Sequence, residues 1–569
     1  MPRPCWPSGR RWSFWKLNPV KAVLEYAKWL WRSSAGARLP IILNVLAGCL
    51  SVGLNLYFIW LSKTLVDIAT GSLQVEGYDS LLFNAGLLVV VMLLRLGINA
   101  YASRLENLTF SKMNFILRQR LFASLLQSRW QGKEKMHSGD TLNRLFSDAD
   151  QVTRVICQEL PSFFTTLIQL VAAVIFLATM DVRLALVLLL ITPFFLAFSK
   201  VFFRKVRTLT KEIRENESRV QSHIQESLQH KTLLQSLERE DYAQDYLSQL
   251  QTDEYQQVVR RTNINVFART SVSLAFGAGY LAALFWGVFG IYEGTLTFGV
   301  LTAFLQLVGQ VQGPTGRLTR QIPGFVYATA SIDRLRELED APKEEDGEPI
   351  RLDAPVGIAF DQVTFRYPDG RRNILDGFSY DFRPGSRTAV LGETGVGKST
   401  MIRLVLSLLK PVSGSVCLYD GKQRVPVSAR SRVNLVYVPQ GNSLFSGTIR
   451  DNLILGDPDA TEEAMWQALD CAAAGFVRTL ERGLDTVCGE QGAGLSEGQA
   501  QRIAIARGLL RPGSVLLLDE FSSSLDPETE ACLMKNLTAG YQGKTMIFIT
   551  HREKIAEYCD AILRLSEVS

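Results

Sequence analysis

Six apolar runs in the first 316 residues constrain the fold of this chain more than any other feature. Most of them are about 20 residues long and nearly free of charge, which is long enough to cross a bilayer. No run of comparable length follows, although the whole chain is an ordinary 47% hydrophobic. The pattern predicts a helical membrane domain; the alternative is a set of buried core helices in a large soluble protein. The expected spans lie near residues 41–62, 81–103, 160–180, 182–199, 271–292 and 298–316.

Lysine and arginine are unevenly placed around these runs. The N-terminal tail and the long segments 104–159 and 200–270 are basic, whereas the connections VDIATGSLQVEGYDS and IYEGTLTF contain neither residue. Because basic segments stay on the cytoplasmic side, we expect the tail, both long segments and the C-terminal part there. The sequence thus predicts a multi-pass integral membrane protein, in the inner membrane of a bacterium.

The tail lacks the apolar stretch and cleavage site of a signal peptide. It is rich in arginine, so a transit peptide is one interpretation; the other is an amphipathic helix along the membrane surface at residues 18–31. A polar segment, ELEDAPKEEDGEP, follows the last apolar run and marks a boundary near residue 340. These features predict a membrane domain over residues 1–340, a linker over 341–352 and a second domain over 353–569.

A glycine-rich stretch in the second domain, GETGVGKS, fits the pattern G-x-x-x-x-G-K-[ST]. It stands between an apolar strand at 386–391 and a helical pattern at 401–409, which is the context that this motif needs. Its backbone N–H groups and the helix N-terminus would face phosphate oxygens. We expect Lys398 to reach the β- and γ-phosphates and Ser399 to bind Mg²⁺. The predicted ATP-binding residues of this loop are Gly392, Glu393, Thr394, Gly395, Val396, Gly397, Lys398, Ser399 and Thr400.

Two carboxylates end a second apolar stretch, SVLLLDE. Residues 515–518 are predicted to form a strand that is buried on both faces within a parallel sheet. Asp519 at its end can bind Mg²⁺, and Glu520 can orient or deprotonate an attacking water. A pair of solvated strand-end carboxylates is the alternative, but with the glycine-rich loop the pair completes the groups for phosphoryl transfer.

The segment between these two sites, GAGLSEGQAQRIAIARGLL, resembles the signature of the ABC transporter ATPases, usually LSGGQ. Further family motifs stand in the expected order over about residues 353–569, including SSLD at 523–526, which resembles the D-loop. This resemblance implies that Tyr367 stacks on adenine and that Gln440 contacts Mg²⁺ and water. It also implies that His551 contacts the γ-phosphate and acts with the catalytic Glu520.

The signature departs from the family pattern at one position, where Glu497 replaces the first glycine. Ser496, Gly498 and Gln499 match the phosphate-contacting positions of the family. The same residues also predict ordinary helix chemistry, in which Ser496 and Gln499 form a capping box and Glu497 suits the helix dipole. Both interpretations are compatible, and Glu497 leaves only the speed of hydrolysis open.

The resemblance implies an exporter-type half-transporter, similar to lipid A flippase and bacterial multidrug half-transporters. Its fold would be an α-helical membrane domain of six transmembrane helices with long cytoplasmic extensions, fused to an α/β P-loop nucleotide-binding domain. Residues 138–152 and 227–240 resemble the intracellular loops of such exporters. The expected cofactors are ATP and Mg²⁺, and the expected cargo is an amphipathic lipid, drug or lipid-linked molecule.

In this family each ATP lies between the P-loop of one domain and the signature of another. This chain has one of each, so a second half-transporter is the expected partner, with a homodimer favoured. ATP binding would close the ATPase pair and turn the cavity outward, and hydrolysis would reset it. Three alternatives stay open: an importer with the exporter fold, one half of a heterodimer, and an ATP-gated channel or regulator.

Three arginines suggest how cargo is bound. Arg95 lies inside an otherwise apolar run, so it should face a cavity or a partner and not lipid. Arg317 and Arg320 follow the sixth run, whose helix lines the translocation cavity in related transporters, and glycine and proline at 313–316 could loosen it. We expect the three to surround a cavity for an amphipathic anion; the alternative is that Arg317 and Arg320 reach lipid headgroups or pair with acids.

Other features exclude several functions. The eight cysteines show no metal-binding spacing, and reduced thiols are expected. The net charge of +5 is modest, and no basic surface interleaved with aromatic residues indicates nucleic-acid binding. Anionic membrane lipid accounts better for the basic tail.

Overall fold

The computed structural model describes residues 19–73, 78–130, 138–353, 355–367, 370, 372–393, 395–489, 494–541 and 543–565, without the side chains of 19–23, 138–139, 187–204, 207 and 319. The chain divides into two units. We call Met1–Phe122 with Asp140–Glu339 the helical unit, and Ala123–Gly139 with Asp340–Ser569 the mixed unit.

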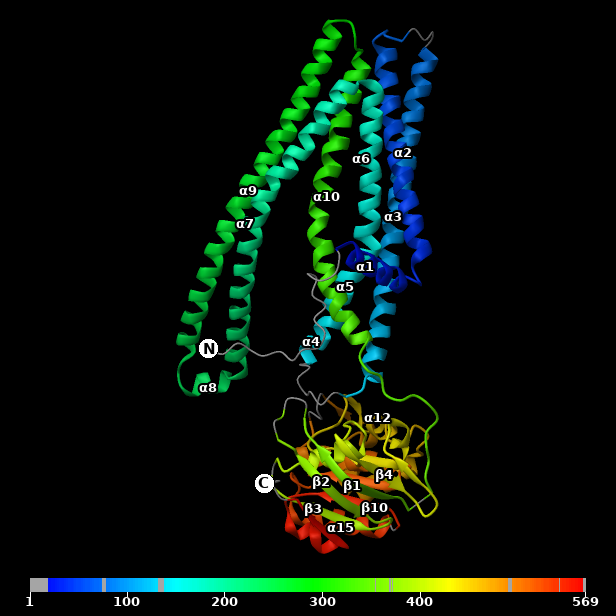
Figure 1. The fold of residues 1–569 in the computed structure, drawn as a ribbon, viewed down its shortest axis with the longest axis vertical. Helices are drawn as coiled ribbons and strands as arrows, with labels where there is room; N and C mark the ends of the chain where they lie inside the picture. The colour runs from blue at the N-terminus through cyan, green and yellow to red at the C-terminus, as the bar shows by residue number, and fades with distance from the viewer. Residues whose placement is uncertain are drawn as a thin grey trace. The chain divides into compact units, whose positions relative to one another are not determined.

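The helical unit consists of long helices joined by short turns (Figure 1). Two π-helical turns, Arg144–Asp148 and Val155–Glu159, join α4, α5 and α6 into one helical stretch. The helices are α1 Pro19–Ser33, α2 Arg38–Ala69, α3 Tyr78–Gln127, α4 Ser138–Asn143, α5 Ala149–Arg154, α6 Leu160–Met180, α7 Val182–Gln229, α8 Lys231–Ser236, α9 Glu240–Tyr292 and α10 Phe298–Glu339.

Helix length explains the long basic segments. Helices α3 and α9 have 50 and 53 residues. At 1.5 Å per residue each is about 75–80 Å long, more than twice the thickness of a hydrocarbon core. Each therefore extends well beyond any membrane it crosses, as the segments 104–159 and 200–270 predicted. In Figure 1, α7 and α9 run side by side to the short α8.

Four helices of the described chain are long and apolar enough to cross a membrane: Arg38–Ala69, Tyr78–Gln127, Asp140–Met180 and Glu240–Tyr292. They contain the first, second, third and fifth expected spans. The fourth, at 182–199, falls mostly on side chains outside the described set. The sixth, at 298–316, lies in α10, which does not reach the same apolar character because three glutamines interrupt it: Gln306, Gln310 and Gln312.

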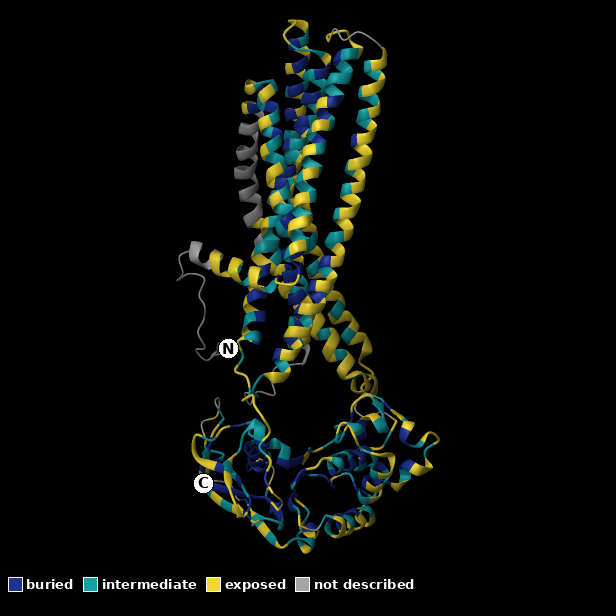
Figure 2. Cartoon of the chain, turned by 90° about the vertical axis from the view of Figure 1, so that its right-hand side faces the viewer, coloured by how far each residue is buried: buried dark blue, intermediate teal, exposed yellow. Residues whose placement is uncertain are grey.

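One cluster of buried apolar side chains joins several helices of the helical unit. Ile59 of α2, Leu177 of α6, Ala283 of α9 and Phe304 of α10 form one buried cluster. Between α6 and α7 the chain turns sharply at Asp181, whose Oδ1 accepts from Arg183 N at 2.8 Å and so caps α7. The outer faces of these helices stay exposed along much of their length (Figure 2).

The mixed unit is built from two larger sheets and the helices around them (Figure 1). Its strands are β1 Gly357–Phe365, β2 Leu375–Phe382, β3 Arg387–Leu391, β4 Ser413–Tyr419, β5 Arg424–Pro426, β6 Leu435–Val438, β7 Gly447–Thr448, β8 Val487–Cys488, β9 Val515–Asp519, β10 Thr545–Ile549 and β11 Ala561–Arg564. Its helices are α11 Lys398–Val405, α12 Ile449–Ile454, α13 Glu462–Cys471, α14 Glu497–Leu510 and α15 Pro527–Gly540, with 3₁₀ turns at Ala429–Asn434, Gly475–Thr479, Gly483–Asp485 and Glu553–Tyr558.

The five-stranded sheet is parallel, in the order β11-β3-β10-β9-β6. Strands β9 and β10 are buried at every position, as the apolar run at 515–518 predicted. The four-stranded sheet, β2-β1-β4-β5, is antiparallel. Parallel order matters for function, because it brings the carboxyl ends of neighbouring strands to one edge.

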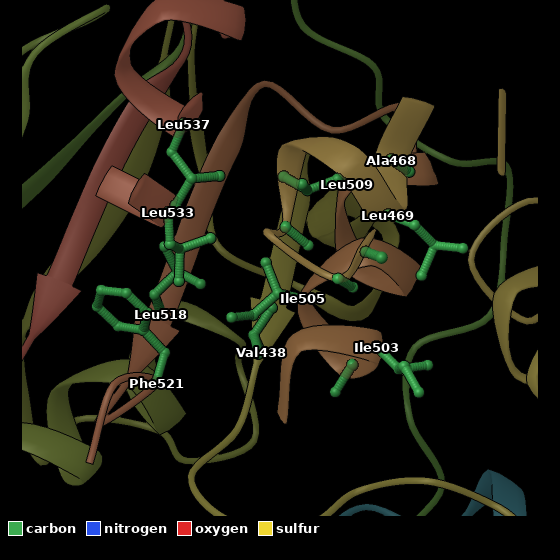
Figure 3. Packing of buried hydrophobic residues seen from close by; sticks show 14 of the residues in the cluster. Val438, Ala468, Leu469, Ile503, Ile505, Leu509, Leu518, Phe521, Leu533 and Leu537 are labelled. Atoms are coloured by element: carbon green, nitrogen blue, oxygen red, sulfur yellow. The ribbon is translucent and has the colours of Figure 1, made fainter. Parts of the chain in front are cut away.

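An apolar cluster supports this edge from one side of the parallel sheet (Figure 3). It joins Val438 of β6 and Leu518 of β9 to Ile505 of α14 and Leu533 of α15. All four residues are buried. The loops that follow these strands therefore start from fixed positions.

Candidate functional site

Four loops of the mixed unit start at the same edge of the parallel sheet. The glycine-rich loop follows β3, Glu520 follows β9, His551 follows β10, and Gln440 follows β6. Paired residues near these ends, such as Ile549 with both Val390 and Asp519, keep the ends level. Ligands of open α/β sheets bind at this edge. The structure thus brings together the loop, the two carboxylates and the histidine that the sequence placed far apart.

The glycine-rich loop depends on glycine at two of its positions. Gly395 and Gly397 have φ angles of +93° and +107°, a region that glycine adopts without strain. A Cβ atom on Gly397 would also lie 2.8 Å from Cγ2 of Ile374. Gly397 caps α11 without any side-chain hydrogen bond, so the first N–H groups of α11 have no side-chain cap. Val396 is buried, and Thr394 lies outside the described residues.

Lys398 is buried at the start of α11, and the loop itself binds its ammonium group. Its Nζ donates to the carbonyl of Gly392 at 2.5 Å and to that of Glu393 at 3.0 Å. Both acceptors are neutral carbonyl groups, so these two hydrogen bonds do not neutralise the positive charge of Lys398. A phosphate group would supply one, which fits the predicted role of Lys398.

Tyr367 is fixed against the first turn of α11. Its hydroxyl lies 3.2 Å from Oγ1 of Thr400 and accepts from Arg403 Nη1 at 3.2 Å. Its ring meets Phe365 edge to face, with the centroids 5.0 Å apart. The aromatic ring that should stack on adenine and the loop that should hold phosphate are therefore parts of one site.

Asp519 ends β9 as a buried carboxylate. Burial and the neighbouring charge of Glu520 raise its pKa to about 6, although Arg403, Lys398 and a hydrogen bond with Ser399 lower it. A hydroxyl and a carboxylate in contact are the oxygen ligands that Mg²⁺ prefers. The residues Ser399 and Asp519 therefore fit the predicted cation, which would also relieve the cost of the buried charge.

Glu520 adopts a backbone conformation that the sequence did not reveal. Its φ of +44° is uncommon for a residue with a side chain and indicates local strain. Its N–H donates to the carbonyl of Ile549 at 2.9 Å. Its Oε2 accepts from Gln440 Nε2 at 2.5 Å, so two residues that were predicted separately are in direct contact. His551 is exposed beyond β10.

The signature residues lie at the start of α14. Ser496 and Gln499 form the predicted capping box: Gln499 N donates to Ser496 Oγ at 3.2 Å and Ser496 N donates to Gln499 Oε1 at 2.9 Å. Gly498 is buried, and a Cβ atom there would lie 2.7 Å from the carbonyl oxygen of Ser524. Glu497 is exposed. These hydrogen bonds close the turn upon itself and do not involve the glycine-rich loop.

The three arginines predicted to line a cavity lie in the helical unit. Arg317 of α10 donates to Gln169 Oε1 of α6 at 2.7 Å, and Gln169 donates in turn to Gln310 at 2.5 Å. Arg320 donates to Gly316 O of its own helix at 3.2 Å. Arg95 is half-buried on α3. The polar groups thus link α6 to α10, while the cavity around the three arginines stays a prediction.

Sequence reasoning missed Arg403, which contacts Tyr367 and acts electrostatically on Asp519. A signal was present, because Arg403 follows Ser399 by four residues and such pairs share one face of a helix. The contact between Gln440 and Glu520 had no signal in the sequence, since it depends on the neighbouring strands β6 and β9.

Comparison with known families agrees with this geometry. Residues 39–315 match the family model described as the ABC transporter transmembrane region, and residues 375–523 match the one described as ABC transporter. A bacterial Atm1-family ABC exporter with ATP bound has a similar fold, with a TM-score of 0.79 and 22% identity, over 94% of this chain and 96% of that chain.

Curated relatives are similar over most of their length. The Bacillus subtilis protein named "Putative multidrug export ATP-binding/permease protein YgaD" is 28% identical over 531 residues, which is 92% of this chain and 91% of the relative. A Staphylococcus aureus protein with the same description is 28% identical over 486 residues, which is 84% of this chain and 83% of that protein. The chain therefore belongs to the ABC transporters, as an integral membrane half-transporter in which one transmembrane region and one ATPase domain share a chain with the exporter fold.

Proposed function

We propose that two copies of this chain form an exporter that moves an amphipathic substrate across the inner membrane by alternating access, driven by ATP. The observation that carries the proposal is the shared sheet edge, where the open start of α11, Asp519 and Glu520 meet. The names of the relatives, which include multidrug export, support export as the direction. The ATPase domain would lie in the cytoplasm.

The residues of the edge divide the work of ATP hydrolysis. Tyr367 offers a ring for adenine, and Lys398 with the N–H groups of the loop neutralises phosphate charge. Ser399 and Asp519 would hold Mg²⁺, which withdraws charge from the phosphates. Glu520 orients or deprotonates the attacking water, and its present bond to Gln440 keeps the carboxylate at the edge. His551 would contact the γ-phosphate.

The signature of the second copy would complete the site. One chain has one glycine-rich loop and one signature, and the hydrogen bonds of Ser496 and Gln499 are made within their own turn. In a homodimer both sites would carry Glu520 and His551, so both would be competent. ATP would then hold the two domains together, and hydrolysis would release them.

Glu520→Gln tests the chemistry. The variant should bind ATP as the wild type does, while its turnover falls by roughly 10²-fold or more, the scale of a lost general base. Steady-state ATPase and nucleotide binding in lipid nanodiscs measure both. The exposed Glu481→Gln is the matched control and should hydrolyse ATP normally. Normal turnover in Glu520→Gln would remove Glu520 from this role.

The substrate proposal is an amphipathic anion held by Arg95, Arg317 and Arg320. The contact of Arg317 with Gln169 supports a polar site between α6 and α10. Anionic amphiphiles should stimulate ATPase activity in nanodiscs more than cationic ones, and Arg95→Ala and Arg317→Ala/Arg320→Ala should reduce this stimulation. Stimulation by cationic compounds alone, unchanged in these variants, would contradict an anionic substrate and leave the ATPase intact.

A further inference from the structure

Trp130 and Arg403 are in contact within the mixed unit, although the sequence separates them widely. The guanidinium carbon of Arg403 lies 5.0 Å from the centroid of the Trp130 ring. An arginine over the face of an indole is an attractive pair, and the attraction grows as water is excluded. Both side chains are half-buried, and Trp130 packs on the core cluster that contains Leu404 and Val405 of α11. The pair is therefore a partly desolvated contact on the helix that begins with Lys398.

Arg403 also contacts Tyr367, the residue whose ring is expected to stack on adenine. Its Nη1 donates to the hydroxyl oxygen of Tyr367 at 3.2 Å. Since that oxygen accepts from Arg403, its own proton is free to point to Oγ1 of Thr400, 3.2 Å away. Two directed hydrogen bonds then fix the phenol, while Phe365 holds the ring from its side. Arg403 thus supplies one of the two hydrogen bonds that hold the hydroxyl of Tyr367.

The segment that carries Trp130 is attached to the rest of the mixed unit by backbone pairing. Arg129 N donates to the carbonyl of Pro342 at 2.7 Å, and Glu344 N donates to that of Gln127 at 3.0 Å. Ser128 and Lys343 form an antiparallel bridge between these bonds. Trp130 is therefore placed by a short ladder and not by its side chain alone.

This ladder is linked to the end of α11. Both carboxylate oxygens of Glu344 accept from Arg432, at 2.6 and 2.7 Å. Arg432 Nε also donates to the carbonyl of Leu406 at 2.6 Å, directly after α11. The segment following α3 is consequently tied to α11 at two points, through Trp130 to Arg403 and through Glu344 and Arg432 to Leu406.

We propose that Arg403 is a positioning residue of the ATP site, which holds the Tyr367 ring in place for adenine and is itself held by Trp130. The segment that directly follows α3, a helix long and apolar enough to cross a membrane, would then influence how tightly ATP binds. The inference rests on the proposed function, because it takes Tyr367 as the adenine contact.

Steady-state ATPase of the full chain in nanodiscs tests the inference. Arg403→Gln, Trp130→Leu and Tyr367→Phe should each raise the KM for ATP by about 3- to 30-fold, the range of a lost cation–π or hydrogen-bonding contact. The kcat should stay within about twofold, because such a contact is the same in the ground state and the transition state. Trp130→Leu combined with Arg403→Gln should raise KM no further than either change alone, since both break one chain of contacts. Trp130→Phe, which keeps an aromatic face, should give an intermediate KM.

The same unit offers a matched control pair. Arg478 lies over the ring of Trp466 at 4.3 Å and pairs with Asp470, without contact to Tyr367. Arg478→Gln and Trp466→Leu remove the same kind of interaction and should leave the KM for ATP unchanged. They report what the loss of a cation–π contact does to stability alone.

Three results would overturn the inference. One is an unchanged KM in Trp130→Leu while Arg403→Gln raises it, which would detach Trp130 from the site. Another is a lower melting temperature in all variants with KM unaffected, which would make the contacts structural only. The third is an equal KM increase in the Arg478 and Trp466 variants. A wild type without ATPase activity would instead refute the proposed function itself.

Discussion

Two helices of the ATPase domain begin in opposite ways. Helix α11 starts after Gly397 with no side-chain cap, and the buried ammonium of Lys398 stands beside this start. Helix α14 starts with a reciprocal capping box, in which Ser496 and Gln499 satisfy each other's backbone groups. Both starts carry the positive end of a helix dipole, yet only the first lacks a side-chain cap.

The difference teaches how the two halves of an ATP site can be divided. An open helix start beside a lysine offers backbone N–H groups and a positive charge to a phosphate, so we expect the glycine-rich loop of a single chain to bind phosphate. At the capped start, Ser496 Oγ and Gln499 Oε1 accept hydrogen bonds from the turn itself, so the groups that can donate to a phosphate are the Ser496 hydroxyl proton and Gln499 Nε2.

The largest expected effect is at the open start. Lys398→Ala should lower ATP affinity by roughly 30- to 1,000-fold, as expected when one partner of a buried charge contact is removed. Equilibrium binding of a fluorescent ATP analogue measures it. Lys410→Ala is the control, since Lys410 is an exposed lysine of the same domain. Wild-type affinity in Lys398→Ala would break the comparison, because α11 would then bind phosphate without its lysine.

The next effect concerns the carboxylate beside this start. Burial, with the charge of Glu520, raises the pKa of Asp519 from 3.8 to about 6. Between these values the folded protein binds the proton more tightly than the unfolded chain, so stability falls as pH rises through this range and stays lower above it. Asp519→Asn should therefore melt about 3–6 °C above the wild type at pH 8 without nucleotide, and the gain should shrink towards pH 4.5.

Asp519→Asn should at the same time lose Mg²⁺-dependent ATPase activity. Thermal unfolding at several pH values, with EDTA present, separates the two effects. If Asp519→Asn melts below the wild type at pH 8, the charged carboxylate stabilises the fold. That result would contradict the expectation that burying this charge costs stability.

The smallest effect is at the capped start. Glu497→Gly loses a helix-dipole contribution of about 0.3–1 kcal/mol and some helix propensity, so stability should change little. Because the capping box does not use Glu497, hydrolysis should stay equal or rise. ATPase and melting temperature measured side by side check this. A collapse of activity would assign the Glu497 carboxylate a specific task at the site.

Local patterns predicted the parts of this site that depend on neighbours in sequence. The strand before the loop, the helix after it and the capping box all follow from short-range rules, and the structure contains them. The resemblance to a family placed Gln440 and His551 in order along the chain. Both residues follow strands of one parallel sheet, so the parallel order alone places them at the same edge.

What could not be predicted depends on contacts between distant segments. The strain at Glu520 arises where β9 ends against Ile549 of β10, and no local signal requires it. The contact between Trp130 and Arg403 depends on the ladder that attaches residues 127–129 to the linker. The sixth expected span differs in another way. Glutamines within α10 lower its apolar character, so a criterion based on apolar character alone does not identify it as a membrane span.

The central claim is that the capped start of one chain completes the open start of another. Coexpression of Lys398→Ala with Ser496→Arg tests it most directly. Each variant alone should lack ATPase activity, since both of its sites would be defective. A mixed dimer would contain one site with an intact loop and an intact signature, so the account predicts that activity returns to about one quarter to one half of the wild type. No recovery in purified mixed dimers would contradict it and would mean that the loop and signature of the same chain work together.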